Sequence, residues 1–226
     1  MTEKKTPLIE IENLTRWYPD SPSMIFKKFN FKLWPGEFVF IVGKSGVGKT
    51  TLVKFIIRQL RPPRKTIFFN KEDISRFSDK EVQKYRRQIG VIFQDFKLVD
   101  WKTVFENIAY PLEIFGFPKD KIKDKVNKLL YKLQLMDKKD ELIPKLSGWE
   151  KQRVAIARAL VHNPKFIIAD EPTWNLDWEA SKKIADILIE LNKSWHTILF
   201  ITHDLALLDY VKNKYSKVRV EEINRR

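Results

Sequence analysis

The sequence predicts an α/β fold whose core is a mostly parallel sheet. Short apolar runs recur along the chain, at residues 38–42, 89–94, 166–171 and 198–204. Segments with helical spacing of apolar residues lie between them. A strand buried on both faces is apolar along its length, and strands that alternate with helices form a parallel sheet with covering helices. Polar residues end three of these runs, at the strand ends where such sheets bind their ligands.

The composition limits the class of protein. The chain has 226 residues, enough to bury a large core, and it contains no cysteine, which excludes disulfides and thiolate zinc sites. Its three histidines exclude a histidine-rich metal cluster. No apolar stretch is typical of a signal peptide or approaches the roughly 20 residues of a membrane span. We therefore expect a soluble protein inside the cell.

The net charge of +14 has three explanations. A basic surface binds nucleic acid, lies against an anionic membrane, or is simply a lysine-rich solvated face. The lysines are dispersed along the chain rather than gathered in one block. This favours the solvated face, followed by an anionic membrane surface, and we expect no specific nucleic acid partner.

The first part of the chain predicts further β structure. Residues 8–14 and 29–33 alternate apolar and polar side chains, the pattern of half-exposed strands. Pro35-Gly36 predicts a turn into the strand at residues 38–42. Tyr18 precedes that strand and is an aromatic residue that could stack on adenine; alternatively, it closes a sheet edge.

A glycine-rich loop connects the strand at residues 38–42 to a helix-spaced segment at 51–58. Its sequence, GKSGVGKT, matches the phosphate-binding pattern G-x-x-x-x-G-K-[ST]. Glycines let backbone N–H groups face phosphate oxygens, and the helix N-terminus adds partial positive charge. We expect Lys49 to contact the β- and γ-phosphates and Thr50 to ligate Mg²⁺. The predicted ATP contacts here are Gly43, Lys44, Ser45, Gly46, Val47, Gly48, Lys49, Thr50 and Thr51.

The middle of the chain predicts a strand at residues 66–69, then a short helix. Ser78 is the expected N-cap of this helix, and Glu81 completes a capping box. From residue 95 to 146 the period is helical, and one helix has an apolar stripe formed by Ile122, Val126, Leu129, Leu130 and Leu133. We expect one domain over residues 1–226, with a core at about 1–94 and 147–226 and an inserted helical lobe at about 95–146.

Four polar side chains end predicted strands. Asp170 suits a metal ligand, and Glu171 suits a general base that orients the attacking water. His203 would contact the γ-phosphate, and Gln94 the metal or the water. A further helix begins near Ser147-Gly148, and a small polar residue with a glycine suits anion contact at a helix N-terminus.

Taken in order, these motifs make the sequence resemble the ABC-type ATPases over essentially its whole length. Residues 43–50 resemble the Walker A motif, Gln94 the Q-loop and residues 166–171 the Walker B motif. Residues 146–153 resemble the signature, residues 175–177 the D-loop, and His203 the switch histidine. The resemblance implies a P-loop NTPase fold of ABC type, with an N-terminal antiparallel β part and an inserted helical lobe.

The resemblance also implies an ATP-hydrolysing homodimer. Each ATP would lie between the P-loop of one chain and the signature of the other, contacted across the dimer by Ser147, Gly148, Trp149 and Asp177. Tyr18 would stack on adenine. Glu171, His203 and Gln94 would be catalytic, and Mg²⁺ would be held by Thr50, Gln94 and Asp170.

Within this superfamily, residues 86–98 and 103–109 are similar to the cell-division family FtsE. That likeness implies an integral, FtsX-like membrane partner docked near residues 96–110, and a peripheral location on the cytoplasmic face of the cell membrane. It also implies a role in cell division and the control of cell-wall hydrolases. Phe96, Trp101 and Phe105 are candidate anchors for the partner; alternatively, they pack within the helical lobe. Lipoprotein-release and macrolide-export ATPases are similar in the same stretches.

Two functions of other classes stay open. A soluble ABC ATPase acting on nucleic acid or ribosomes would suit the basic charge, but the sequence has no long coiled-coil heptad pattern between its Walker motifs and no second nucleotide domain. A non-hydrolysing, nucleotide-gated scaffold gains support if Trp149 blocks the γ-phosphate contact.

Three tryptophans occupy positions where the family has glycine: Trp149 in the signature, Trp174 before the D-loop and Trp195 in a turn. Our hypothesis is that their codons are UGA, which some bacterial lineages read as glycine and other codes read as tryptophan. The native protein would then carry glycine at all three positions. UGG codons there would contradict it.

Overall fold

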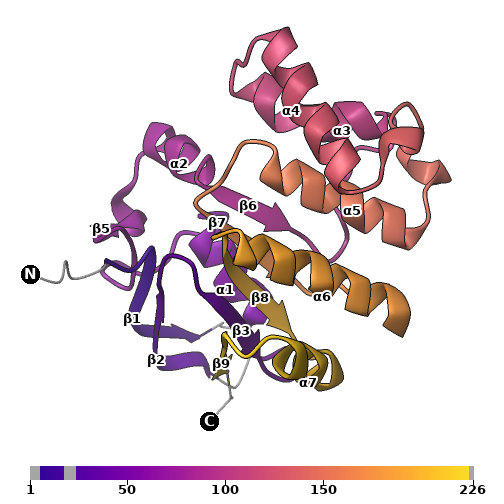
Figure 1. Cartoon of the computed structure of the whole chain (residues 1–226). Helices are drawn as coiled ribbons and strands as arrows, with labels where there is room; N and C mark the ends of the chain where they lie inside the picture. Colours follow the sequence, from indigo (N-terminus) through magenta and orange to yellow (C-terminus); the bar gives the residue numbers. More distant parts are fainter. Residues whose placement is uncertain (1–5, 18–23, 224–226) are drawn as a thin grey trace, which may run out of the picture.

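The computed structural model describes residues 6–17 and 24–223 and contains the expected parallel sheet. Its strand order is β6-β7-β8-β3-β9 (Figure 1). The strands are β3 (Phe38–Val42), β6 (Ile89–Ile92), β7 (Phe166–Asp170), β8 (Thr197–Thr202) and β9 (Val218–Glu222). The central strands β3, β7 and β8 are buried along their whole length, as their continuous apolar sequences predict.

A second, antiparallel sheet comes mainly from the N-terminal part of the chain. Its order is β2-β1-β4-β5. The strands are β1 (Ile9–Trp17), β2 (Met24–Leu33), β4 (Ile67–Phe69) and β5 (Glu72–Asp73). Gly36, with φ +80°, turns the chain from β2 into β3, and thereby joins the two sheets.

Seven helices are present in the described residues. They are α1 (Lys49–Ile56), α2 (Asp79–Arg86), α3 (Val104–Ile114), α4 (Lys119–Lys132), α5 (Gly148–Leu160), α6 (Trp178–Lys193) and α7 (Leu205–Lys214). The capping box of Ser78 and Glu81 is confirmed, and Ser147 caps α5 in the same way with Glu150. These caps fix where α2 and α5 begin.

Side chains from the two faces of the parallel sheet enter two separate cores. On one face, Phe40 stacks on Phe200 of the neighbouring strand, with ring centroids 4.5 Å apart, in a core that also contains apolar residues of α5 and α6. On the other face, Val39 and Leu199 pack against α1 and the antiparallel sheet. Because consecutive strand residues point to opposite faces, the same five-residue run of β3 supplies both cores.

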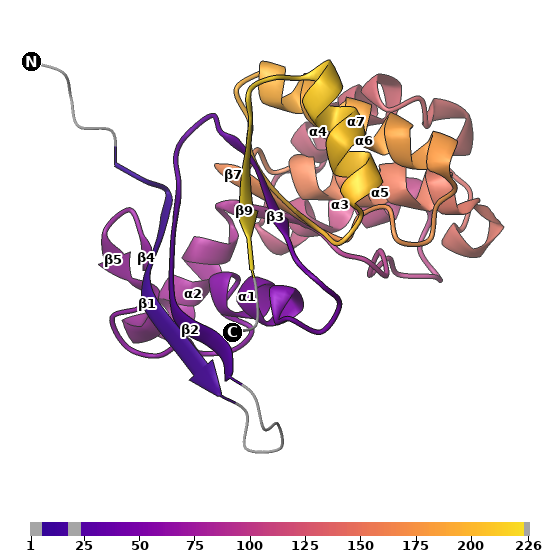
Figure 2. The same cartoon turned by 90° about the horizontal axis from the view of Figure 1, so that it is seen from below.

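Helices α3 and α4 lie at the opposite end of the molecule from the antiparallel sheet (Figures 1 and 2). The apolar stripe of α4 is buried as expected at Ile122, Val126 and Leu130. Helix α3 packs against α5. As a result, α5 lies between the two outer helices and the parallel sheet. Among the described helices, none has both the length and the apolar character needed to cross a membrane.

Candidate nucleotide site

The glycine-rich loop leaves β3 and enters α1 under tight steric limits. A Cβ atom at Gly43 would overlap the carbonyl oxygen of Ile223, which follows β9. Gly46 and Gly48 have φ values of +75° and +109°, and Gly48 is the N-cap of α1. Residues with a side chain rarely adopt these angles. The local backbone thus explains the glycine spacing of the sequence motif.

Lys49 folds back over this loop. Its Nζ atom donates hydrogen bonds to the carbonyl oxygens of Gly43, at 2.6 Å, and Lys44, at 3.2 Å. It also lies 3.4 Å from Oε1 of Glu171. The Lys49 side chain is 6% exposed, so these oxygens supply its charge compensation.

Glu171 connects the loop to the end of β8. Its Oε2 atom accepts hydrogen bonds from Oγ1 of Thr202, at 3.1 Å, and from the backbone N–H of His203, at 3.3 Å. Nδ1 of His203 lies 2.9 Å from the same oxygen. The backbone of Glu171 is left-handed, with φ +48°. Four groups from two segments, the start of α1 and the end of β8, therefore hold a carboxylate whose own backbone is strained.

Asp170, the last residue of β7, is buried and its Oδ1 atom has no hydrogen-bond partner in the described part of the chain. Burial, and to a smaller extent the neighbouring carboxylate of Glu171, raise the pKa of Asp170, which lies at about 6. Lys49 opposes both effects. An unpartnered buried carboxylate oxygen is costly unless a ligand satisfies it.

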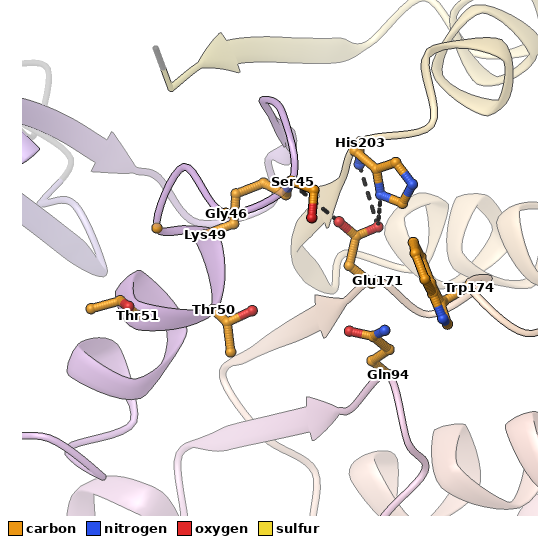
Figure 3. A pocket seen from close by; sticks show the side chains of 10 residues that line it. Ser45, Gly46, Lys49, Thr50, Thr51, Gln94, Glu171, Trp174 and His203 are labelled. Carbon is orange, nitrogen blue, oxygen red and sulfur yellow. Dashed lines mark hydrogen bonds and ion pairs between the residues drawn. The ribbon is translucent and has the colours of Figure 1, made fainter. Parts of the chain in front are cut away.

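Most of the predicted ATP-binding, catalytic and metal residues line two adjoining cavities (Figure 3), whereas Gly43, Lys44 and Val47 of the loop line neither. One, of about 310 Å³, is lined by Ser45, Gly46, Gly48, Lys49, Thr50, Thr51, Gln94, Glu171, Trp174 and His203. A neighbouring cavity of about 470 Å³ contains Asp170 and shares Thr50, Gln94 and Trp174 with the first. The ends of β6, β7 and β8 thus meet beside the glycine-rich loop.

The predicted across-dimer residues lie apart from this cavity. Oγ of Ser147 accepts the backbone N–H of Glu150 at the start of α5, and Gly148 lies beside Leu176. Oδ1 of Asp177 accepts the backbone N–H of Ala180 and caps α6. None of Ser147, Gly148, Trp149 and Asp177 lines the cavity of the phosphate-binding loop. Tyr18 lies outside the described residues.

The three tryptophans have different surroundings. Trp195, just after α6, has φ +67° and is 85% exposed. The indole of Trp174 lies over the imidazole of His203, with ring centroids 5.0 Å apart (Figure 3). Trp149 packs partly against the core, with Arg153 and Lys183 near its ring. Only Trp195 has the backbone angle that favours glycine.

Sequence reasoning missed two contacts. Thr202 is fully buried and donates to Glu171, and its place between a buried strand and a histidine is the signal that was available. Trp174 lines both cavities, although the sequence marked it only as a departure from a motif.

The family model described as "ABC transporter" matches residues 26–174. The chain belongs to the ABC transporter ATPase family. The Bacillus subtilis cell division ATP-binding protein FtsE is 40% identical over 207 residues, which are 92% of this chain and 90% of that protein. The Escherichia coli K12 protein of the same name is 41% identical over 201 residues, 89% of this chain and 90% of that protein.

Solved structures of ABC ATPases have the same fold. The dimeric, post-hydrolysis state of the ATP-binding cassette MJ0796 bound to ADP and Pi has a TM-score of 0.82 at 31% identity, covering 96% of this chain and 94% of that one. The cbiO1 protein of Clostridium perfringens, part of the ABC transporter complex cbiONQ, has a TM-score of 0.81 at 32% identity, covering 92% and 82%. The predicted ABC ATPase fold is therefore confirmed. As a member of this family, the chain is an ATP-binding and ATP-hydrolysing subunit.

Proposed function

We propose that this ABC ATPase dimerises on ATP and drives an integral membrane partner, in the cell-division role of its FtsE relatives, including the control of cell-wall hydrolases. The observation that carries the catalytic part is the position of Glu171 between Lys49 of the loop and His203 of the β8 end. The FtsE likeness, at 40% and 41% identity, supports the cellular part. Lipoprotein release or macrolide export is the alternative within the family.

The same geometry supports a mechanism of phosphoryl transfer to water. Lys49 exchanges the carbonyl oxygens of Gly43 and Lys44 for phosphate oxygens, and its departure releases Oε1 of Glu171. Glu171 then takes a proton from the water that attacks the γ-phosphorus, while the bond to the ADP oxygen breaks. Thr202 and His203 keep the carboxylate oriented through Oε2.

We also propose a Mg²⁺ site formed by Thr50, Gln94 and Asp170. The three residues line one cavity, and the unpartnered buried Oδ1 of Asp170 suits a cation. Bound there, Mg²⁺ would neutralise charge on the phosphate oxygens. The described residues contain no group of three or more histidine, cysteine, aspartate or glutamate side chains placed for a metal. A site completed by a hydroxyl, an amide and phosphate oxygens is consistent with this.

Homodimerisation is supported by the distance, within one chain, between the P-loop cavity and the signature residues that would contact ATP. Ser147, Gly148, Trp149 and Asp177 lie outside the P-loop cavity, where a second chain could reach them. The relative MJ0796 is dimeric with ADP and Pi. We propose that the signature of each chain completes the site of the other.

The surface of the helical lobe is where we place the membrane partner. Trp101 is 82% exposed, whereas Phe96 and Phe105 pack partly against the core. Apolar exposure continues along α3 and beyond at Tyr110, Ile114 and Phe117. A cavity of about 540 Å³ lies between α3 and α4 and includes Phe105. Exposed aromatic and aliphatic side chains beside a groove suit a partner helix.

Location and domain boundaries remain part of the proposal. We place the protein on the cytoplasmic face of the cell membrane, where its charge of +14 would favour anionic lipids. The single domain would have its core at about 1–94 and 147–226. Only helical elements and loops lie between the end of β6 and the start of α5, which supports the lobe at about 95–146.

We further propose glycine at positions 149, 174 and 195 of the native protein. The left-handed backbone at Trp195 supports this at one of the three. Positions just past a helix C-terminus with this angle are usually glycine. At Trp149 and Trp174 the support is the family pattern alone. Glycine at 149 would favour hydrolysis over the scaffold function.

Capture from native membranes tests the function. The bait is the tagged chain carrying Glu171→Gln, to hold the ATP state, and the readout is identification of bound proteins after detergent extraction. We expect one integral membrane protein, lost with Ile114→Glu but kept with Tyr131→Glu, which alters an exposed side chain on α4. Recovery of only ribosomal proteins or nucleic acid would contradict the proposal and favour the soluble class.

A further inference from the structure

The turn that follows Gln94 has a strained backbone and is bound by a side chain of another element, α5. After β6 ends at Ile92, Phe96 and Lys97 have φ values of +58° and +53°. A left-handed backbone is unfavourable for a residue with a side chain. No hydrogen bond of the Gln94 side chain is present in the described part of the chain. The backbone of this turn therefore determines where the Gln94 amide lies in the cavity.

Arg158 of α5 binds both strained residues. Its guanidinium donates to the carbonyl oxygen of Lys97, at 2.5 Å, and to that of Phe96, at 2.6 Å. Arg158 forms no ion pair with the described carboxylates, and its guanidinium donates to these two carbonyl oxygens instead. Burial lowers the pKa of Arg158 to about 10. A half-buried cation without a carboxylate is costly, and here the planar guanidinium fits two successive carbonyl groups.

Strand β6 and helix α5 are in close backbone contact next to Arg158. Gly90 of β6 lies against Ala159, next to Arg158, so closely that a Cβ atom at Gly90 would overlap the carbonyl oxygen of Ala159. The strand that leads to Gln94 and the helix that carries Arg158 thus touch through their backbones. At its other end, α5 begins with Ser147, eleven residues or about 16 Å away.

We propose that Arg158 is the positioning residue for Gln94: its guanidinium holds the turn at Phe96 and Lys97 in the one shape that places the amide in the nucleotide cavity. The inference rests on the proposed role of Gln94. It adds a physical link between α5, which carries the partner-facing Ser147, and a group of the chain's own catalytic site. A shift of α5 would move Arg158, and with it the backbone that carries Gln94.

ATP hydrolysis by Arg158→Met and Arg158→Lys tests this. A misplacement of a catalytic group by about 1 Å lowers the reaction rate by up to about 100-fold. We therefore expect Arg158→Met to lower kcat by about 10- to 100-fold with little change in KM. Arg158→Lys, which cannot bind both carbonyls in the same fork, should be intermediate. In the Gln94→Ala background, Arg158→Met should lower kcat by less than about 2-fold, because the two act through one group.

Arg86→Met is the matched control. Arg86 clamps the carbonyl oxygens of Ile57 and Arg58 in the same manner, and Arg58 has φ +56°. We expect a similar loss of thermal stability with kcat nearly unchanged. Lys97→Gly should partly restore Arg158→Met, because glycine keeps the turn without strain.

The outcomes separate the two proposals. Equal kcat losses from Arg158→Met with and without Gln94→Ala would overturn the inference, as would unchanged kcat in both Arg158 variants. If Arg158→Met does not fold, Arg158→Lys in both backgrounds gives the same decision. Full activity of Gln94→Ala, or an inactive wild type, would overturn the proposed site, and this inference with it.

Discussion

Nζ of Lys49 lies 3.4 Å from Oε1 of Glu171, so the phosphate-binding cation and the candidate base neutralise each other. On the mechanism we propose, a nucleotide separates this pair, because Lys49 moves to the phosphates and the Glu171 carboxylate is left free to act on water. Nucleotide binding and activation of the proposed base would then be one event.

Glu171→Gln should separate binding from hydrolysis. The amide keeps the size of the side chain but cannot take a proton, so we expect hydrolysis to fall by about 100- to 10,000-fold. ATP affinity should stay equal or rise, because the competing ion pair is gone. Phosphate release and equilibrium nucleotide binding measure the two effects. Glu179→Gln, at an exposed pair with Lys182, is the control. Hydrolysis above a tenth of the wild-type rate would contradict the role.

Asp170→Asn should change stability in a pH-dependent way. The folded chain holds the Asp170 proton up to about pH 6, whereas an unfolded chain releases it near pH 4. The free energy of unfolding therefore falls as pH rises from about 4 to 6, and it stays lower above about pH 6. We expect the variant's stability relative to wild type to be greater at pH 8 than at pH 4 by roughly 1–3 kcal/mol.

Urea unfolding at the two pH values measures this, with exposed Asp124→Asn as the control. In the presence of Mg²⁺ and ATP the wild type should be more stable than Asp170→Asn at pH 8, because only the wild type gains stability from the metal complex. The same variant effect at both pH values would contradict a raised pKa.

Trp195→Gly should stabilise the protein. The residue is left-handed and largely exposed, so glycine removes strain and little packing; we expect a gain of roughly 0.5–1.5 kcal/mol. Trp101→Gly is the control, because Trp101 is equally exposed at 82% but not left-handed. Thermal unfolding of both decides. A loss of stability in Trp195→Gly would argue that the indole belongs there.

A peptide mass spectrum of the protein from its native host should show glycine at position 149. The measurement covers residues 146–153, and a peptide across 195 gives the second reading. If tryptophan is found at 149, the signature contact is altered. We would then expect ATP binding with weak or absent hydrolysis.

The sequence predicted local features well. The bounds of β3 and the cap at Ser78 follow from residue type and spacing, and both are confirmed. It did not reveal β9, because Val218–Glu222 is an edge strand that is only partly buried and therefore lacks a continuous apolar run. The position of Gln94 was foreseen at a strand end, but the means of holding it was not.

Long-range contacts account for what was missed. Arg158 looks like one helical residue among others, and nothing near it in sequence indicates that its carbonyl partners lie about sixty residues earlier. Thr202 likewise gains its role only when β7 and β8 lie side by side. At positions 149 and 174 the family pattern favours glycine, but the backbone does not require it, since neither residue is left-handed.

Ser147 lies apart from the P-loop cavity of its own chain, which affects how the rate of hydrolysis depends on the concentration of the protein. If a second copy completes each site, the rate rises with the square of the subunit concentration while dimers are scarce. A membrane partner that holds two copies would replace this dependence with a fixed local concentration, in the millimolar range for short tethers. The amount of the membrane partner, rather than of the ATPase, would then determine the total rate of ATP hydrolysis by this protein in the cell.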